Sequence, residues 1–188
     1  MEMKRISLFY GFIGLFLLGC LLGILFTGVS PESAEALFSN LKSFFGGTIG
    51  ENIDKFSLFT FIFFNNTRVA IISAFGGLLF GVVPAGILFF NGFVVGIVLG
   101  YFHSQGESFL RLLLAIVPHG VLEIPAFAVA GLGGVEWYFE VVRGRGTLKE
   151  RFMNGFVKSM RMLALALLML LIAAFVEAYI TPTVASIG

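Results

Sequence analysis

Residues 69–102 read VAIISAFGGLLFGVVPAGILFFNGFVVGIVLGYF, 34 residues without a charged side chain. A single helix of this length would extend about 51 Å at 1.5 Å per residue, too long for the roughly 30 Å hydrocarbon core of a bilayer. Pro84 and the Asn91-Gly92 pair interrupt the run. The stretch therefore predicts two short spans, at about 67–83 and 89–102, joined by a tight turn. A re-entrant loop is the alternative, because irregular backbone is allowed at membrane depth where protein or water satisfies it.

The composition of the whole chain points the same way. Of its 188 residues, 58% are hydrophobic and 12% are charged, and the mean hydropathy is +1.00. Soluble domains carry about 25% charged residues, so this chain cannot cover a water-facing surface. A net charge of +1 gives no case for a nucleic-acid partner, and a single Cys excludes an intrachain disulfide framework. We predict one integral membrane domain over residues 1–188, all-α, with the lipid bilayer as its surroundings.

Three further apolar runs predict spans at about 6–28, 108–134 and 160–180, which makes about five spans in an α-helical bundle. The first run has two other interpretations, a cleaved signal peptide and a lipoprotein cleavage box ending at Cys20. We favour an uncleaved span, because the apolar sequence continues well past Cys20. The fourth span is interrupted by Pro118 and Pro125, which predicts a broken helix.

The segment 31–64 has the composition of an interfacial amphipathic helix. Ser30-Pro31-Glu32 is typical of a helix start, and Gly46-Gly47 predicts its end. Residues 57–64 are very aromatic and could instead begin the next span. We favour the interfacial interpretation, because the polar residues at 65–68 would otherwise lie together at the middle of the membrane.

Charge asymmetry predicts the orientation of the chain. Five spans place the N-terminus and the basic 136–158 connection on the same side of the membrane. Basic residues collect on the cytoplasmic side of membrane proteins. We therefore expect a multi-pass protein of the cell membrane with the N-terminus and the 136–158 loop in the cytoplasm and the C-terminus outside. The basic segment could also contact anionic lipid headgroups.

Small residues recur at the four-residue spacing that lets helix backbones approach closely. The pairs Gly19/Gly23 and Gly77/Gly81 show it, and so does a longer series at Gly92, Gly96 and Gly100. The spacing predicts helix packing inside this chain or, as the alternative, a homo-oligomer interface.

Polar groups within the apolar sequence are the candidate functional residues, because such groups are costly in a membrane and usually have partners or a function. They are Asn65, Asn66, Arg68, Asn91, His119, Gly120, Glu123 and Glu177. His119 and Glu123 share one helix face at i, i+4, and Pro118 is placed to start a half-helix just before them. We expect His119 and Glu123 to be buried and to interact with Asn91 first and Arg68 second.

Three roles remain open for these candidate residues: a hydrogen-bond network that fixes helix packing, a path for a solute or proton, or recognition of a partner. His119 and Glu123 supply two metal ligands where a closed zinc site needs four. The sequence contains no HExxH or GxSxG motif of proteases, no P-loop, and no GxGxxG in a phosphate-binding context. We therefore predict no metal, no cofactor and no enzymatic activity.

Several motifs together resemble the stage II sporulation protein M family, and the resemblance covers nearly the whole chain. The motifs are Asn65-Asn66-Thr67-Arg68, Gly76-Gly77-Leu78-Leu79-Phe80-Gly81, Phe90-Asn91-Gly92, Pro118-His119-Gly120-Val121-Leu122-Glu123-Ile124-Pro125 and Val176-Glu177-Ala178-Tyr179-Ile180-Thr181-Pro182. The resemblance implies a polytopic membrane protein with about five spans and no agreed catalytic residue. The bacterial namesake acts in engulfment of the forespore with peptidoglycan-degrading partners, but members also occur in archaea that do not sporulate.

Taken together, these features predict a non-enzymatic scaffold or recruiting partner in membrane or envelope remodelling, with protein partners whose identity the sequence does not name. The alternative is a small transporter or channel, either as a single chain or as an oligomer. Broken helices and polar groups at membrane depth mark binding sites in transporters.

Overall fold

The computed structural model describes residues 2–49 and 54–181 of the chain. Within them, the side chains of residues 2–4, 42, 44–49, 115, 118 and 119 lie outside the described part. The described residues form six α-helices and one π-helical turn: α1 (Glu2–Val29), α2 (Pro31–Ile49), α3 (Lys55–Gly76), α4 (Val82–Ser104), α5 (Phe109–Arg143), α6 (Leu148–Phe175) and η1 (Val176–Ile180).

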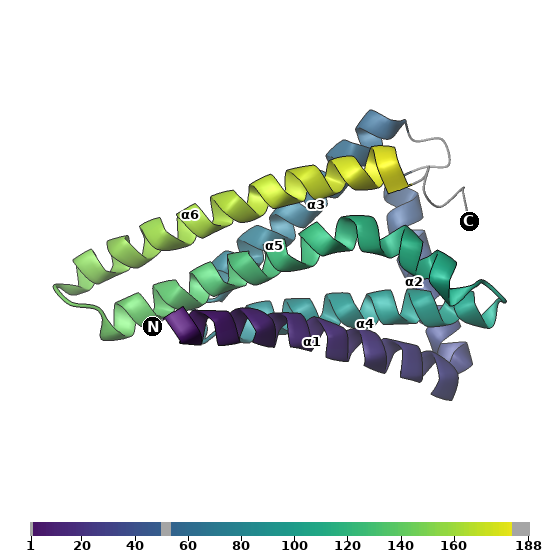
Figure 1. The fold of residues 1–188 in the computed structure, drawn as a ribbon, viewed down its shortest axis with the longest axis horizontal. Coiled ribbons are helices and arrows are strands. Elements are labelled where there is room, and N and C mark those ends of the chain that lie inside the picture. Colours follow the sequence, from purple (N-terminus) through teal and green to yellow (C-terminus); the bar gives the residue numbers. More distant parts are fainter. Residues whose placement is uncertain (1, 50–53, 182–188) are drawn as a thin grey trace.

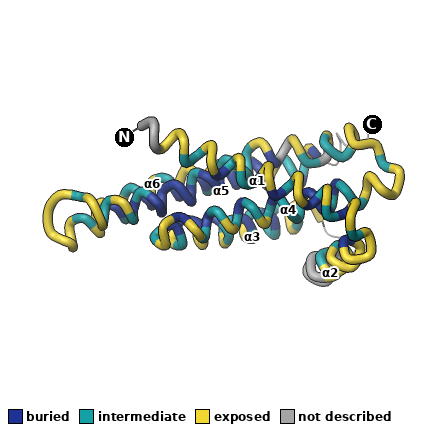
Figure 2. Tube along the Cα trace, turned by 90° about the horizontal axis from the view of Figure 1, so that it is seen from below, coloured by how far each residue is buried: buried dark blue, intermediate teal, exposed yellow. Residues whose placement is uncertain are grey.

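Figure 1 shows α1, α3, α4, α5 and α6 running lengthwise in the bundle, whereas α2 crosses one of its ends. Seen from below, α2 lies almost end-on while the others lie side-on (Figure 2). Length and composition allow five segments to cross a membrane: Arg5–Val29, Lys55–Gly76, Val82–Ser104, Gly120–Arg143 and Leu148–Ile180. The prediction of an all-α bundle with about five spans is therefore confirmed, and the chain is a multi-pass membrane protein.

The start of α3 overturns the predicted bounds of the second span and of the interfacial segment. Residues 57–64 belong to the same helix as residues 65–76, so the helix begins at Lys55 rather than near residue 67. Asp54 caps it by accepting from the N–H groups of Phe56 and Ser57 at 3.0 and 3.1 Å. The Ser57 hydroxyl, followed by the backbone bonds, holds the pKa of Asp54 below its usual value. The polar groups near 54 thus mark the beginning of a span.

The segment predicted as interfacial, residues 31–64, contains a helix that is shorter than the segment. It is α2, which begins at Pro31 as expected but continues through Gly46-Gly47 to Ile49. The Phe38 ring stacks on Tyr101 with ring centroids 4.2 Å apart, so α2 is held against the end of α4.

The turn between α3 and α4 lies at residues 77–81, and the predicted breaks at Pro84 and Asn91-Gly92 are wrong. Phe80 and Gly81 take left-handed backbone conformations, with φ of 57° and 78°. Pro84 lies in the first turn of α4, where a missing N–H leaves no helical bond unmade. Asn91-Gly92 lies inside the helix, so α4 runs unbroken from Val82 rather than from residue 89.

The fourth span also extends further than predicted. The α5 helix runs through Pro118 and Pro125 to Arg143, and Figure 1 shows it bent rather than divided into half-helices. The predicted 136–158 loop is mostly helical, and only residues 144–147 connect α5 to α6. Polar residues of this region are paired across the two helices: Lys158 Nζ lies 2.5 Å from Glu140 Oε2. Pairing of this kind lets charged residues continue a helix that composition alone assigned to a loop.

Glycines bring α1 and α4 into close contact. A Cβ on Gly19 would collide with the Phe89 carbonyl, and one on Gly96 would collide with the Cys20 carbonyl. Gly23 and Gly92 meet backbone atoms of the opposite helix in the same way. These glycines therefore pack helices of one chain against each other.

Gly77 and Gly81 have a different role from the one their spacing predicted. Both lie in the α3–α4 turn, and Gly77 faces the backbone of Gly134 in α5. The four-residue spacing here does not lie along one helix, because α3 ends at Gly76.

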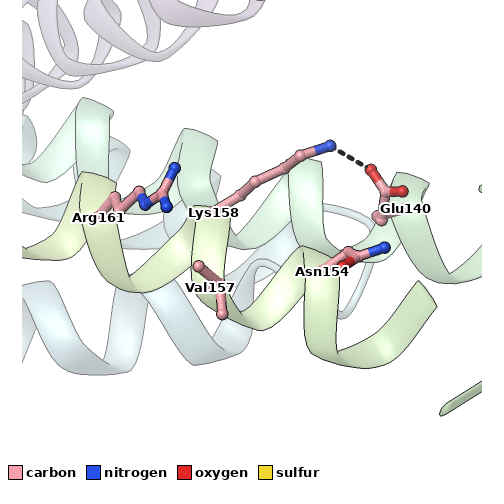
Figure 3. Close-up of a pocket in the computed structure, with 5 residues that line it drawn as sticks. All are labelled: Glu140, Asn154, Val157, Lys158 and Arg161. Atoms are coloured by element: carbon pink, nitrogen blue, oxygen red, sulfur yellow. Dashed lines mark hydrogen bonds and ion pairs between the residues drawn. The ribbon is translucent and has the colours of Figure 1, made fainter. Parts of the chain in front are cut away.

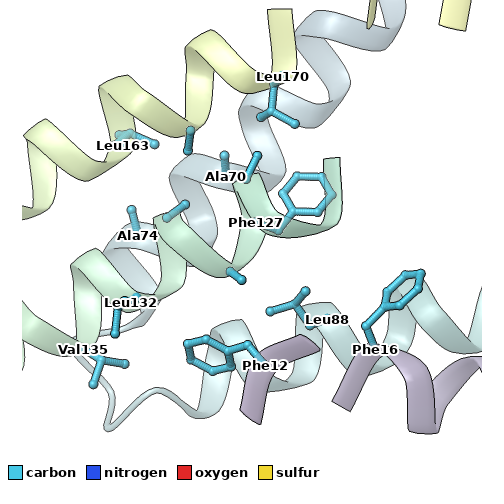
Figure 4. Packing of buried hydrophobic residues seen from close by; sticks show 14 residues of the cluster. Phe12, Phe16, Ala70, Ala74, Leu88, Phe127, Leu132, Val135, Leu163 and Leu170 are labelled. Atoms are coloured by element: carbon cyan, nitrogen blue, oxygen red, sulfur yellow. The ribbon is translucent and has the colours of Figure 1, made fainter. Parts of the chain in front are cut away.

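The centre of the bundle is α5, which packs against all the other lengthwise helices. Figure 4 shows its Phe127, Leu132 and Val135 between side chains of α3 and α6 on one side and of α1 and α4 on the other. Small residues make this possible: Gly131 faces Pro84 and Ser73, and Gly133 faces α6. Their sequence signal is the run AFAVAGLGG at 126–134, which contains only small and apolar residues.

Thr147→Ala should lower the free energy of unfolding by about 1 kcal/mol, the usual cost of losing a helix N-cap. The Thr147 hydroxyl accepts from the Glu150 N–H at 3.3 Å, and the Glu150 carboxylate accepts from the Thr147 N–H at 2.8 Å. Thr147→Ser keeps both bonds and is the matched control. Reversible unfolding in mixed micelles, followed by circular dichroism, measures the difference. Identical unfolding curves for the Ala and Ser variants would contradict the role of this cap.

Candidate functional site

Polar side chains from three elements meet where α3, α5 and η1 pack together. Asn66 of α3 donates a hydrogen bond from its amide to Glu123 Oε1 of α5. Asn65 donates in turn to Asn66 Oδ1 at 3.4 Å. Glu177 of η1 lies close enough for its charge to act on Glu123. We call Asn65, Asn66, Glu123 and Glu177 the polar core.

The surroundings of the polar core are only partly accessible. Asn66 is buried, and Glu123 and Glu177 are half-buried. An amide donor is a suitable partner for a carboxylate in an apolar setting, since a buried polar group without a partner costs free energy. The Glu177 carboxylate opposes ionisation of the Glu123 carboxylate, because like charges repel. Chemically, the pair can accept hydrogen bonds and can take up or release a proton.

The helix around Glu177 is itself unusual. Residues Val176–Ile180 form a π-helical turn at the end of α6, and such turns occur frequently at functional sites. The Phe175 and Tyr179 rings stack on this turn with centroids 4.9 Å apart. Lys55, at the start of α3, lies 6.0 Å from the centre of the Tyr179 ring. Contacts from α3 therefore hold the turn that carries Glu177.

Two predicted partners of Glu123 are placed elsewhere. The Asn91 amide donates to the Ile87 carbonyl of its own helix at 2.8 Å, so the prediction that Asn91 is the first partner of Glu123 is wrong. Arg68 is exposed and forms no ion pair with Glu123. Gly120 is buried, and a Cβ added there would meet only side chains of its own helix. The His119 side chain lies outside the described part of the chain.

A sequence signal for the Asn66 contact does exist. Asn66, Ala70, Ser73 and Gly77 follow one another at intervals of four, three and four residues, which is one face of a helix. Asn66, Ala70 and Ser73 are all buried on α3, and Ser73 donates to the Phe127 carbonyl of α5 at 3.4 Å. The same face holds Gly77 against α5. This stripe of small and polar residues is the sequence signal for the side of α3 that faces α5.

A second group of polar residues lies at the opposite end of α5. Arg5 of α1 pairs with Glu136 at 2.5 Å, and Arg151 donates to the Val141 carbonyl at 3.0 Å. Beside them, five residues line a recess of about 290 Å³ between α5 and α6: Glu140, Asn154, Val157, Lys158 and Arg161 (Figure 3). Among the described residues, no three His, Cys, Asp or Glu side chains gather as metal ligands would.

Comparison with known proteins agrees with the motifs. The model of the family described as stage II sporulation protein M matches residues 12–182. Two similar proteins of Methanocaldococcus jannaschii are named as uncharacterized. MJ0793 is 30% identical over 133 residues, which cover 68% of this chain and 73% of that protein. MJ0706 is 29% identical over 140 residues, which cover 72% of this chain and 61% of that protein.

No solved structure matches the chain. The family match nevertheless includes every described helix from the middle of α1 to η1, and with it all the residues of the polar core. The chain therefore belongs to the stage II sporulation protein M family.

Proposed function

We propose that this protein is a non-enzymatic scaffold of the cell membrane that recruits protein partners during membrane or envelope remodelling. The observation that carries the proposal is the hairpin formed by the end of α5 and the start of α6. It extends beyond both the start of α1 and the α3–α4 turn (Figure 1). Figure 2 shows its tip as exposed, and residues 145–150 are all exposed.

The hairpin has the properties of a rigid docking element. The capping box of Thr147 and Glu150 fixes the start of α6, and Lys158–Glu140 ties the two helices together. Trp137 packs edge-to-face against Phe152 and Phe156, with centroids 5.0 and 5.3 Å away. A stiff hairpin loses little conformational entropy when a partner binds. Exposed charged residues at its tip offer contacts for that partner: Arg143, Arg145, Lys149 and Glu150.

Charge supports a cytoplasmic position for the hairpin. The start of α1, the α3–α4 turn and the α5–α6 hairpin lie at one end of the bundle, and η1 lies at the other (Figure 1). Arg5 and most of the basic residues of the hairpin are at the first end. The preference of basic residues for the cytoplasmic side supports an orientation with the N-terminus and the hairpin inside and the C-terminus outside.

Site-specific crosslinking tests the proposal. A photo-crosslinking amino acid at Arg145, at the hairpin tip, should give a discrete adduct with one protein in native membranes. The matched control places the crosslinker at Gln105, an exposed residue of the connection between α4 and α5 at the opposite end. The adduct should be absent from the control and should be lost when the tip charges are replaced by Gln. The same adducts from both positions, or none from Arg145, would contradict recruitment through the hairpin.

A transporter or channel is the second candidate, and the polar core favours it. Glu123 and Glu177 place two carboxylates in the region where α5 and η1 meet, beside a π-helical turn. Ionisable groups inside membrane proteins are often parts of ion or proton paths. Purified protein in liposomes with a pH-sensitive dye inside should then show a proton flux that Glu123→Gln abolishes. A flux no greater than that of empty liposomes, under an imposed gradient, would remove proton transport as a function.

A further inference from the structure

The α5–α6 recess combines basic charge with a position at the polar boundary of a spanning helix. Asn154, Lys158 and Arg161 lie at i, i+4 and i+7, so they share one face of α6. Figure 3 shows Lys158 and Arg161 along this face, with Glu140 of α5 opposite Lys158. Lys158 is paired with Glu140, whereas Arg161 is exposed and forms no ion pair with a described residue. The side chains of the recess therefore carry a net charge of +1, two basic groups against one acid.

The level of the recess along the spanning helices indicates what kind of ligand reaches it. Arg161 is the last charged residue of α6 before an uncharged stretch that continues from Met162 to Val176. Long basic side chains at such a boundary reach the headgroup level of the bilayer. On α5, Glu140 lies one turn from Glu136, whose partner Arg5 precedes the apolar part of α1. Charged groups on three helices thus mark the level at which lipid phosphates lie.

We infer that this recess binds the phosphate group of an anionic phospholipid. The Arg161 guanidinium has the planar donor geometry that binds phosphate oxygens in pairs. The Lys158 ammonium has three donors, of which the contact with Glu140 uses one, and the Asn154 amide supplies two more. One phosphodiester charge neutralises the net charge of the recess. The volume of about 290 Å³ is sufficient for a headgroup, and the acyl chains would extend along the apolar surface of α6.

Equilibrium binding of fluorescent phosphatidylglycerol to the intact protein in a neutral detergent tests the inference. We expect wild-type protein to bind this lipid at least about tenfold more tightly than phosphatidylcholine. Arg161→Gln should weaken binding about fivefold, which corresponds to about 1 kcal/mol per basic residue near a membrane surface. Arg161 is exposed, so this variant should fold normally. Arg161→Lys keeps the charge without the paired donors, so its affinity for phosphatidylglycerol should lie between those of wild type and Arg161→Gln.

The matched control is Arg145→Gln, which removes the same charge from the connection between the helices rather than from the recess. Its affinity for phosphatidylglycerol should remain within about twofold of wild type, because a charge far from the phosphate is screened over about 10 Å at moderate salt. Glu140→Gln should strengthen binding severalfold, because it removes the acid that opposes the phosphate and frees Lys158.

Two results would overturn the inference. Equal losses of phosphatidylglycerol affinity in Arg161→Gln and Arg145→Gln would mean that the general surface charge attracts the lipid and that the recess does not bind it. Competition by millimolar inorganic phosphate, with no preference for phosphatidylglycerol over phosphatidylcholine, would mean that the recess takes a soluble anion and not a lipid.

Discussion

Gly96→Ala should lower the free energy of unfolding by about 2 kcal/mol, within the range of about 1–3 kcal/mol found when a close-packed interior is overfilled. The added Cβ would lie 2.9 Å from the Cys20 carbonyl carbon and closer still to its oxygen. These are backbone atoms of α1, so no side-chain rotation relieves the collision and the two helices must separate.

Gly86→Ala is the matched control, because Gly86 lies on the same helix and no atom comes within 4 Å of the position that its Cβ would take. There the substitution should be neutral or stabilising by up to about 1 kcal/mol, since Ala favours a helix over Gly. Unfolding in mixed micelles should therefore separate the two variants by about 2 kcal/mol or more, which is roughly the sum of these effects. Equal stabilities would show that the α1–α4 backbone contact does not limit the fold.

The helix content and the number of spans could be predicted from the sequence because they depend on local composition. The glycine spacing on α4 is also a local signal, since Gly92 and Gly96 lie four residues apart in one helix, and it predicts close packing without naming α1 as the neighbour. The position of the α3–α4 turn was not predictable in this way. An uncharged run offers glycine or proline at several places, and the choice of residues 77–81 over Pro84 depends on Gly77 meeting Gly134 in α5.

The partner of Glu123 was harder to predict than the fold, because it depends on which helices are neighbours. Assigning residues 57–64 to the membrane surface placed Asn66 near the headgroups, where it needed no partner. Once α3 is a full span, Asn66 faces α5 and donates to Glu123, 57 residues away in sequence. Asn91 looked like a better partner because it lies in the uncharged run, but a carbonyl of its own helix already satisfies its amide. Pairing across helices thus depended on knowing which helices are neighbours.

Glu123→Ala should destabilise the protein by about 1–3 kcal/mol, because it leaves the buried Asn66 amide without its acceptor. Glu123→Gln should cost less, since its side-chain carbonyl can still accept from Asn66. Asn66→Ala combined with Glu123→Ala completes a double-mutant cycle. The coupling energy should be about 1 kcal/mol, near the upper part of the range measured for hydrogen bonds between membrane helices.

Asn91→Ala is the control for this cycle, because its amide bonds within α4 and should show no coupling to Glu123. The comparison also separates the two candidate functions. A scaffold needs the Asn66–Glu123 bond only for stability, so Glu123→Gln should retain both its fold and the crosslink from Arg145. A proton path needs the ionisable group itself, so the same variant should keep its stability and lose flux. Coupling of Glu123 to Asn91 rather than to Asn66 would contradict the polar core itself, because the bond that joins α3 to α5 would then contribute nothing.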